Sequence, residues 1–151
     1  MSLSSRSYVG VTAGASAAIA AGILAAAPPA QAATQTFRNV ETQRYLNAQT
    51  NRDVKTVPDR PGTAIWVPIE HSGHRMLKNN STGQCLDSNA NKYVYTNPCD
   101  RNNKNHQWAI LRHNGKILFK NSATGLCLDS NVNGTVYTNT CQMTNRYQQW
   151  G

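Results

Sequence analysis

From Thr36 onward the chain is built from short extended runs in which apolar and polar positions tend to alternate. The runs in the last third read ILFKN, LCLDS, TVYTNT and QQW, and Asn-Gly pairs occur at 114–115 and 133–134. Alternation with period two is typical of half-buried strands, and Asn-Gly is a strong signal for a two-residue hairpin turn. No helical period is visible in residues 33–151. The pattern therefore predicts an all-β domain of short strands.

These runs recur about every 40 residues. A shift of 42 positions superposes residues 78–108 on residues 120–150 with 18 identities among 31 positions. The same shift places the three tryptophans of the chain, Trp66, Trp108 and Trp150, on one another. Self-similarity of this kind indicates repeated supersecondary units. Three units, at about 36–68, 69–110 and 111–151, with four strands each predict twelve strands.

The first unit is a degenerate copy of the other two. Tyr45 and Asp59 stand where the later units have cysteines, and the loop before Trp66 is two residues shorter. Eight of its residues match the second unit in identity or in type, namely Phe37, Asn39, Thr42, Leu46, Asn51, Val54, Thr56 and Pro58. The chain therefore predicts two complete units and one divergent unit.

Equivalent apolar positions, one per unit, are expected to converge on a single shared core. We expect the three tryptophans to lie in this core, without contact to a ligand. The same core should hold three leucines and three valines at repeated positions, namely Leu46, Leu86, Leu128, Val54, Val94 and Val136.

Residues 1–32 have the order of parts of a secretory signal peptide. A polar stretch with Arg6 precedes an Ala-rich apolar run over 11–27, and Ala30-Gln31-Ala32 provides a small-x-small cleavage site. Cleavage near Ala32 predicts a secreted, extracellular domain over 33–151 without a further membrane span. A retained anchor is the alternative, because the apolar run approaches the roughly 20 residues that span a bilayer. The absence of a twin-arginine pair favours the general secretion route.

The cysteines of the exported part indicate disulfide bonds, and its charge indicates the kind of partner. Cys85, Cys99, Cys127 and Cys141 are an even set in an exported chain, which indicates disulfides rather than a thiol nucleophile. Three pairings are possible, and the equal spacing of 14 residues favours Cys85–Cys99 and Cys127–Cys141. Without Arg6 the chain has 14 Lys and Arg against 7 Asp and Glu, a net charge of +7. These basic residues are scattered singly, which argues against nucleic acid and favours an acidic cell envelope as partner.

Three four-stranded units with Cys-Leu-Asp near the start and a Gln-x-Trp-like end resemble the ricin B-type lectins. The resemblance covers residues 36–150 and depends most on the residues 85–87 with 106–108 and 127–129 with 148–150. It implies a β-trefoil, in which a six-stranded barrel is capped by three hairpins. Only 148–150 is a strict Gln-x-Trp, because His106 and Ala64 stand at the glutamine position of the other units.

The resemblance also implies two carbohydrate-binding sites, and no catalytic site, metal or cofactor is expected. In that family the Asp of Cys-Leu-Asp, with an Asn and a Gln before the tryptophan, hydrogen-bonds sugar hydroxyls, and an aromatic ring covers the sugar. Carried over to this chain, the second unit supplies Asp87, Asn97, Asn105 and His106, and the third supplies Asp129, Asn139, Tyr147 and Gln148. The first unit has Asn47 at the Asp position, so no site is expected there.

Both sites depart from the family at the position of the stacking ring. Asn97 and Asn139 occupy it, but Tyr95 and Tyr137 lie two residues earlier and should point to the same strand face. Either these tyrosines cover a sugar from a shifted position, or they are half-buried strand residues. The two aspartates leave a similar choice between ligand binding and capping a turn.

We expect a secreted protein that binds a polysaccharide or a glycan-bearing surface through weak sites in units two and three. The alternative is a β-trefoil that has lost sugar binding and recognises a protein partner. An enzyme is the least favoured class, because no nucleophile and base are placed in a pattern that the repeats leave unexplained. His71 and His74 have a spacing that suits metal ligands, but their place in a hairpin predicts turn polarity instead.

Overall fold

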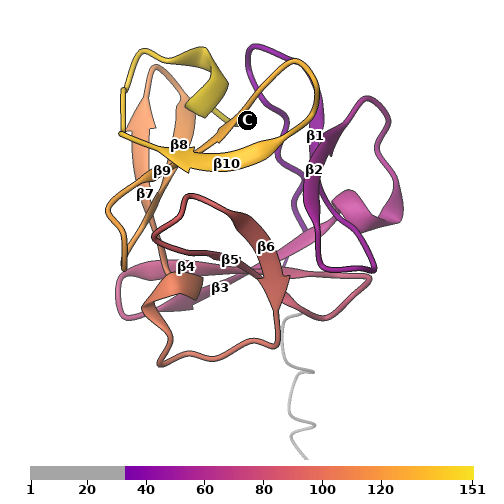
Figure 1. Cartoon of the computed structure of the whole chain (residues 1–151), viewed down its shortest axis with the longest axis vertical. Helices are drawn as coiled ribbons and strands as arrows, with labels where there is room; N and C mark the ends of the chain where they lie inside the picture. Colours follow the sequence, from indigo (N-terminus) through magenta and orange to yellow (C-terminus); the bar gives the residue numbers. More distant parts are fainter. Residues whose placement is uncertain (1–32) are drawn as a thin grey trace, which may run out of the picture. The chain divides into compact units, whose positions relative to one another are not determined.

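The computed structural model describes residues 33–151, so the predicted signal peptide lies outside the described residues. Among residues 33–151 there are ten strands and three short 3-10 helices, arranged as three lobes around a common centre (Figure 1). The strands are β1 Tyr45–Ala48, β2 Val54–Val57, β3 Trp66–His71, β4 His74–Asn79, β5 Cys85–Ser88, β6 Val94–Asn97, β7 Trp108–His113, β8 Lys116–Asn121, β9 Cys127–Ser130 and β10 Val136–Asn139. The helices are η1 Gly62–Ala64, η2 Lys104–His106 and η3 Arg146–Gln148. This architecture confirms the predicted β-trefoil.

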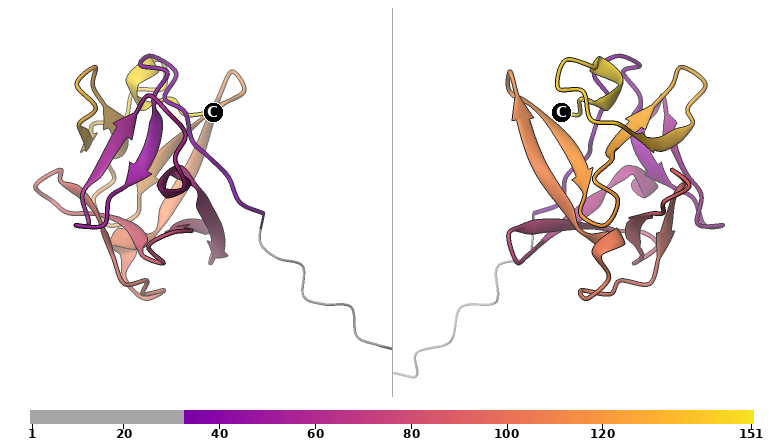
Figure 2. Two further views of the ribbon diagram at one scale, coloured as in Figure 1. Left: turned by 90° about the vertical axis from the view of Figure 1, so that its right-hand side faces the viewer. Right: turned by 60° about the vertical axis from the view of Figure 1, so that its left-hand side comes forward.

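Two long strand pairs and one short pair build the barrel. Two are the hairpins β3–β4 and β7–β8, which connect one unit to the next (Figure 2). The third joins the beginning of unit one to the end of unit three: the N–H of Arg38 donates to the carbonyl of Gly151 over 2.8 Å, and the reverse bond measures 3.0 Å. Pairing there is so short that it appears as an isolated bridge of Trp150 with Asn39, and Trp150 also forms an isolated bridge with Ile117 of its own unit. Two of the twelve predicted strands are therefore reduced to bridges.

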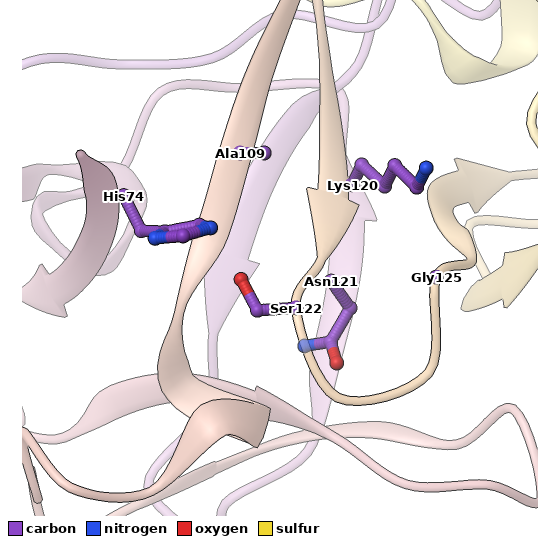
Figure 3. A pocket seen from close by; sticks show the side chains of 6 residues that line it. All are labelled: His74, Ala109, Lys120, Asn121, Ser122 and Gly125. Atoms are coloured by element: carbon purple, nitrogen blue, oxygen red, sulfur yellow. The ribbon is translucent and has the colours of Figure 1, made fainter. Parts of the chain in front are cut away.

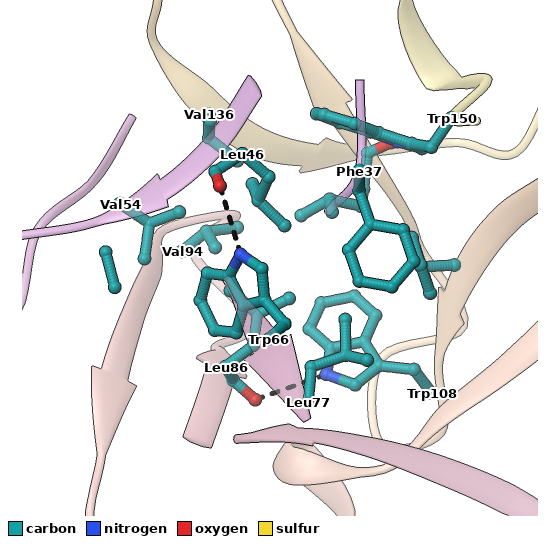
Figure 4. Packing of buried hydrophobic residues seen from close by; sticks show 13 residues of the cluster. Phe37, Leu46, Val54, Trp66, Leu77, Leu86, Val94, Trp108, Val136 and Trp150 are labelled. Carbon is teal, nitrogen blue, oxygen red and sulfur yellow. Dashed lines mark hydrogen bonds between the residues drawn. The ribbon is translucent and has the colours of Figure 1, made fainter. Parts of the chain in front are cut away.

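The hydrophobic core lies where the three units meet (Figure 4). All three tryptophans are completely buried, and each indole N–H donates to the carbonyl of the leucine of its own unit. These bonds join Trp66 to Leu46 at 3.0 Å, Trp108 to Leu86 at 3.2 Å and Trp150 to Leu128 at 3.2 Å. The repeated leucines and valines belong to the same cluster. The predicted core is confirmed, and the repeated polar bond explains why tryptophan recurs at this position.

Three buried asparagines fasten each unit to the one before it. The side-chain N–H of Asn79 donates to the carbonyl of Thr63 in η1, that of Asn121 to Asn105 in η2, and that of Asn39 to Tyr147 in η3, each over 2.7 Å. In each case the side-chain oxygen accepts two backbone N–H groups of the following turn. The turn of one unit thereby holds the short helix of the preceding unit in place.

The capping hairpins also touch one another around the centre of the molecule. The N–H groups of Thr96, Thr138 and Thr56 donate to the carbonyls of Arg52, Lys92 and Gly134, at 2.9, 3.0 and 2.8 Å. Each bond crosses from one unit to the next. Within residues 33–151 no helix is long and apolar enough to cross a membrane.

Candidate functional site

The hairpins β5–β6 and β9–β10 place an aspartate directly opposite a tyrosine. The register pairs Asp87 with Tyr95 and Asp129 with Tyr137. Val94 and Thr96 are buried while Tyr95 and Asn97 are partly exposed, as the alternation predicts. The disulfides have the favoured pairing, Cys85 with Cys99 and Cys127 with Cys141, so that prediction is confirmed. Each disulfide ties the end of its hairpin and thereby limits the loop that leads to η2 or η3.

The site of unit two, called here the Asp87 site, consists of Asp87, Tyr95, Asn97, Asn105 and His106. The side chain of Asp87 is buried, and its Oδ2 accepts from His106 Nε2 at 3.0 Å and from Asn97 Nδ2 at 3.2 Å. His106 Nδ1 lies 3.1 Å from the backbone N–H of Asp100 and 3.2 Å from its carbonyl, so a neutral ring accepts from the N–H and a protonated ring donates to the carbonyl, with Nε2 facing the carboxylate in both cases. The hydrogen bond to Asp87 raises the pKa of His106, against the lowering effect of burial.

The site of unit three, called here the Asp129 site, consists of Asp129, Tyr137, Asn139, Tyr147 and Gln148. Gln148 Nε2 donates to Asp129 Oδ2 at 3.0 Å, and Gln148 Oε1 accepts from the N–H of Gln142 at 2.8 Å. His106 makes the equivalent pair of contacts in unit two. An imidazole and a glutamine amide therefore hold the two carboxylates in the same way.

Each aspartate keeps one carboxylate oxygen that is not paired. No hydrogen bond of good geometry reaches the buried Oδ1 of Asp87 or of Asp129 from residues 33–151, although the N–H of Ser130 and the hydroxyl of Tyr137 lie near enough to Asp129 to oppose the rise in its pKa. Burial raises the pKa of Asp129. A buried acceptor without a partner lowers stability, which argues against a purely structural capping role for these side chains.

Tyrosine side chains border both carboxylates. Burial raises the pKa of Tyr95, and the negative charge of Asp87 raises it further. Burial and the negative charge of Asp129 raise the pKa of Tyr137 in the same way. Tyr147 also contributes to the raised pKa of Tyr137, so a second phenol group lies near Tyr137 in the Asp129 site. In the Asp87 site the position of Tyr147 is taken by the partly buried Asn105. The two sites thus share the carboxylate and one ring but differ in the second polar group.

Two basic residues that the sequence analysis did not single out reach the sites from neighbouring units. Arg52 Nη1 donates to Asn97 Oδ1 at 3.4 Å, and Lys92 Nζ donates to Asn139 Oδ1 at 3.2 Å. Arg52 belongs to unit one and Lys92 to unit two, so each cation crosses to the following unit. The alignment of Arg52, Lys92 and Gly134 at one repeat position is the signal that could have drawn attention to them.

Unit one has no carboxylate at the equivalent place. Asn47 stands there, and its side-chain oxygen accepts from the hydroxyl of Thr63 at 2.6 Å. Ala64 occupies the position of His106 and Gln148, and Val57 that of Asn97 and Asn139. These substitutions remove every side-chain contact that the other two units make to their aspartate.

Two cavities lie at the junctions between units, away from both aspartates. One, of about 350 Å³, is lined by His74 and Ala109 of unit two and by residues of the turn after β8 (Figure 3). The other, of about 320 Å³, has equivalent walls between units three and one, with Lys116, Arg38 and Arg146. Among residues 33–151 no group of three or more His, Cys, Asp or Glu side chains is placed to bind a metal ion.

Comparison with known proteins agrees with the β-trefoil fold. The model of the "Ricin-type beta-trefoil lectin domain" matches residues 33–150. No curated protein sequence matches the chain. Among solved structures, a GlcNAcα1-4Gal releasing endo-β-galactosidase from Clostridium perfringens is 22% identical with a TM-score of 0.73, and the match covers 78% of this chain and 31% of that enzyme.

Two further structures are matched over nearly their whole length. SeviL, bound to asialo-GM1 saccharide, is 17% identical with a TM-score of 0.66, and the match covers 78% of this chain and 93% of SeviL. The designed threefold symmetric protein ThreeFoil is 16% identical with a TM-score of 0.68, with 78% and 95% covered. At these identities the likeness supports the fold alone.

Proposed function

The chain belongs to the ricin-type β-trefoil lectin domain family, and on this basis we propose that it is a secreted protein that binds carbohydrate through the Asp87 and Asp129 sites. The ligand is a polysaccharide or a glycan-bearing surface, bound without catalysis. Secretion is supported by the two disulfides, which persist in oxidising compartments, together with the signal peptide expected at residues 1–32.

The observation that carries the proposal is the pair of buried aspartates, each with one unpaired oxygen. A sugar offers vicinal hydroxyls that could donate to such an oxygen once the side chains that bury it move aside, which would remove the cost of leaving the acceptor without a partner. Folding alone does not require this carboxylate, because unit one has the same hairpin with Asn47 at that position. Each site exchanges bonds with water for bonds with sugar, so each is weak and two on one rigid body gain by avidity.

The test is retention of the domain on immobilised glycans and insoluble polysaccharides. Wild type should be retained on at least one of them, and Asp87→Ala combined with Asp129→Ala should abolish retention. Asn47→Ala is the matched control, because it alters the same position in the unit without a carboxylate, and it should bind as wild type does. Retention of the double variant at wild-type level would show that the sites lie elsewhere.

A second candidate is a trefoil that binds a protein partner. It is favoured by the bond from Asn97 to Asp87, which occupies part of the carboxylate, and by exposed apolar side chains on the capping hairpins. Tyr93 is 68% exposed and Val132 is 66% exposed. A domain that is folded by circular dichroism but retained on no glycan, and that loses a partner on Tyr93→Ser and Val132→Ser, would support this candidate instead.

A further inference from the structure

The two asparagines that replace the stacking ring each contact a cation of the preceding unit. Arg52 contacts Asn97, and Asn97 contacts Asp87, so a guanidinium, an amide and a carboxylate form a continuous chain at 3.4 and 3.2 Å. In the Asp129 site Lys92 takes the role of Arg52 on Asn139. Both cations are exposed, and a bond of 3.2 to 3.4 Å to a neutral amide is weak enough to be exchanged for a ligand.

The backbone at this position favours glycine, not a long side chain. Arg52 and Lys92 have φ values of 75° and 69°, in the left-handed region that is unfavourable for residues with a Cβ. Unit three has Gly134 there, with φ 86°. In all three units the structural contact of the residue is made by its backbone carbonyl, which accepts from a threonine of the next hairpin. Folding therefore needs the carbonyl, and the side chains of Arg52 and Lys92 are kept against the local backbone preference.

At this repeat position a cationic side chain occurs only beside a unit that has the carboxylate. Arg52 faces the unit of Asp87, and Lys92 faces the unit of Asp129. Gly134 faces the unit with Asn47, where a Cβ on the glycine would lie 2.8 Å from the carbonyl of Thr56. The guanidinium of Arg44, in unit one itself, binds that carbonyl. The threefold comparison thus associates the cation at this position with the two units that have a carboxylate.

From these observations we propose that Arg52 and Lys92 make both sites selective for acidic sugars, with the sugar carboxylate bound by the cation and its hydroxyls bound by the aspartate. The inference rests on the proposed function and names its ligand class, a polysaccharide that contains uronate residues. A buried aspartate repels an anionic ligand, so an acidic sugar needs a nearby cation. Guanidinium and ammonium groups both supply it, and arginine can bind a carboxylate with two parallel bonds.

The test compares one polymer in two charge states. Polygalacturonate and its methyl ester have the same backbone, and only the first presents carboxylates. At about 50 mM salt we expect wild type to bind polygalacturonate about tenfold more tightly than the ester, with about threefold contributed by each exposed cation, and the preference should shrink as salt screens the charges. In the variant with Arg52→Gly and Lys92→Gly the ratio of the two dissociation constants should fall to about one.

A control variant removes the same charge elsewhere. Arg60→Gln with Arg112→Gln changes two exposed residues outside both sites, and it should retain the tenfold ratio. If this control loses the preference for polygalacturonate equally, the preference depends only on the net charge of the protein, and the inference is overturned. A wild type that prefers the ester or neutral glycans, with binding still abolished by the two aspartate substitutions, would overturn the inference and leave the proposed function intact. No binding to any polymer would refute the proposed function itself.

Discussion

At the scale of single residues, the buried Asp129 carboxylate lowers the stability of the fold. Burial raises its pKa, so the charged form is disfavoured in the folded state and stability falls as pH rises from the ordinary pKa of aspartate through the raised one. We therefore predict that Asp129→Asn raises the free energy of unfolding at pH 7 by about 1 kcal/mol while it weakens sugar binding. Denaturant unfolding and glycan binding, measured on the same preparation, check both parts.

The opposite result would identify the aspartate as a structural cap. In that case Asp129→Asn would lower the free energy of unfolding, because backbone bonds that need the full negative charge would weaken. Asn47 shows that the hairpin accepts an amide at this position, where it pairs with Thr63. The same substitution thus decides between the two roles that the sequence left open.

Because unit two has a titratable histidine where unit three has Gln148, we expect His106 to add a pH dependence of stability near neutral pH. Its pKa is raised by Asp87, so its contribution to stability is fully present below about pH 6.5, the ordinary pKa of histidine, and is lost as pH rises through the raised value. We predict that His106→Gln keeps the fold, because Gln148 makes the same contacts in unit three, and flattens the stability curve over this window. Chemical unfolding from pH 5.5 to pH 8 measures it. His113→Gln is the control and should leave the slope unchanged.

At the scale of elements, each buried asparagine supports the short helix of the preceding unit, and only two of these helices belong to a site. Asn121 holds η2 through the carbonyl of Asn105, whereas Asn79 holds η1, which belongs to the unit without a carboxylate. We predict that Asn121→Ala and Asn79→Ala each lower the free energy of unfolding by about 3 kcal/mol, because each leaves several buried backbone groups unpaired.

Their effects on binding should differ although their effects on stability are alike. Asn121→Ala should lower affinity at the Asp87 site, because His106 lies in the helix that loses its support, and Asn79→Ala should leave affinity unchanged. Binding is compared by titration at a temperature at which both variants remain folded. Equal loss of binding in the two variants would show that general loosening, not the position of η2, is responsible.

Many features of the strands and turns were predictable because the same residues occur in both unit two and unit three. Cys85 with Cys127, Leu86 with Leu128 and Asp87 with Asp129 recur in register, so alignment alone indicated the disulfides, the core and the carboxylates. Arg52 and Lys92 were missed because their contacts run from one unit to the next, between residues 45 and 47 positions apart. The bond from Asn97 to Asp87 was missed for a different reason: strand alternation gives the face of a side chain but not its rotamer.

At the scale of the whole molecule, the repeat explains why the barrel closes with so little pairing at its ends. Trp150 bridges Asn39 on one side and Ile117 on the other, and its indole is buried against the other two units. Twelve strands were predicted from the period, but the length of the closing pair depends on contacts between residues over 100 positions apart. Local patterns carry no information about such contacts.

The same closure fixes the two sites on one rigid body. We therefore predict that both sites bind one polymer at the same time. On a polymer, Asp87→Ala alone and Asp129→Ala alone should each lower apparent affinity by about 100-fold, because the loss of either site removes the gain from simultaneous engagement. On a monosaccharide each variant should instead retain one site of unchanged affinity, so that only the stoichiometry falls. Calorimetric titration with the monosaccharide and retention on the immobilised polymer separate these outcomes. If one variant alone accounts for the whole loss on both ligands, the molecule has a single working site, and the other aspartate is held by its neighbours without binding sugar.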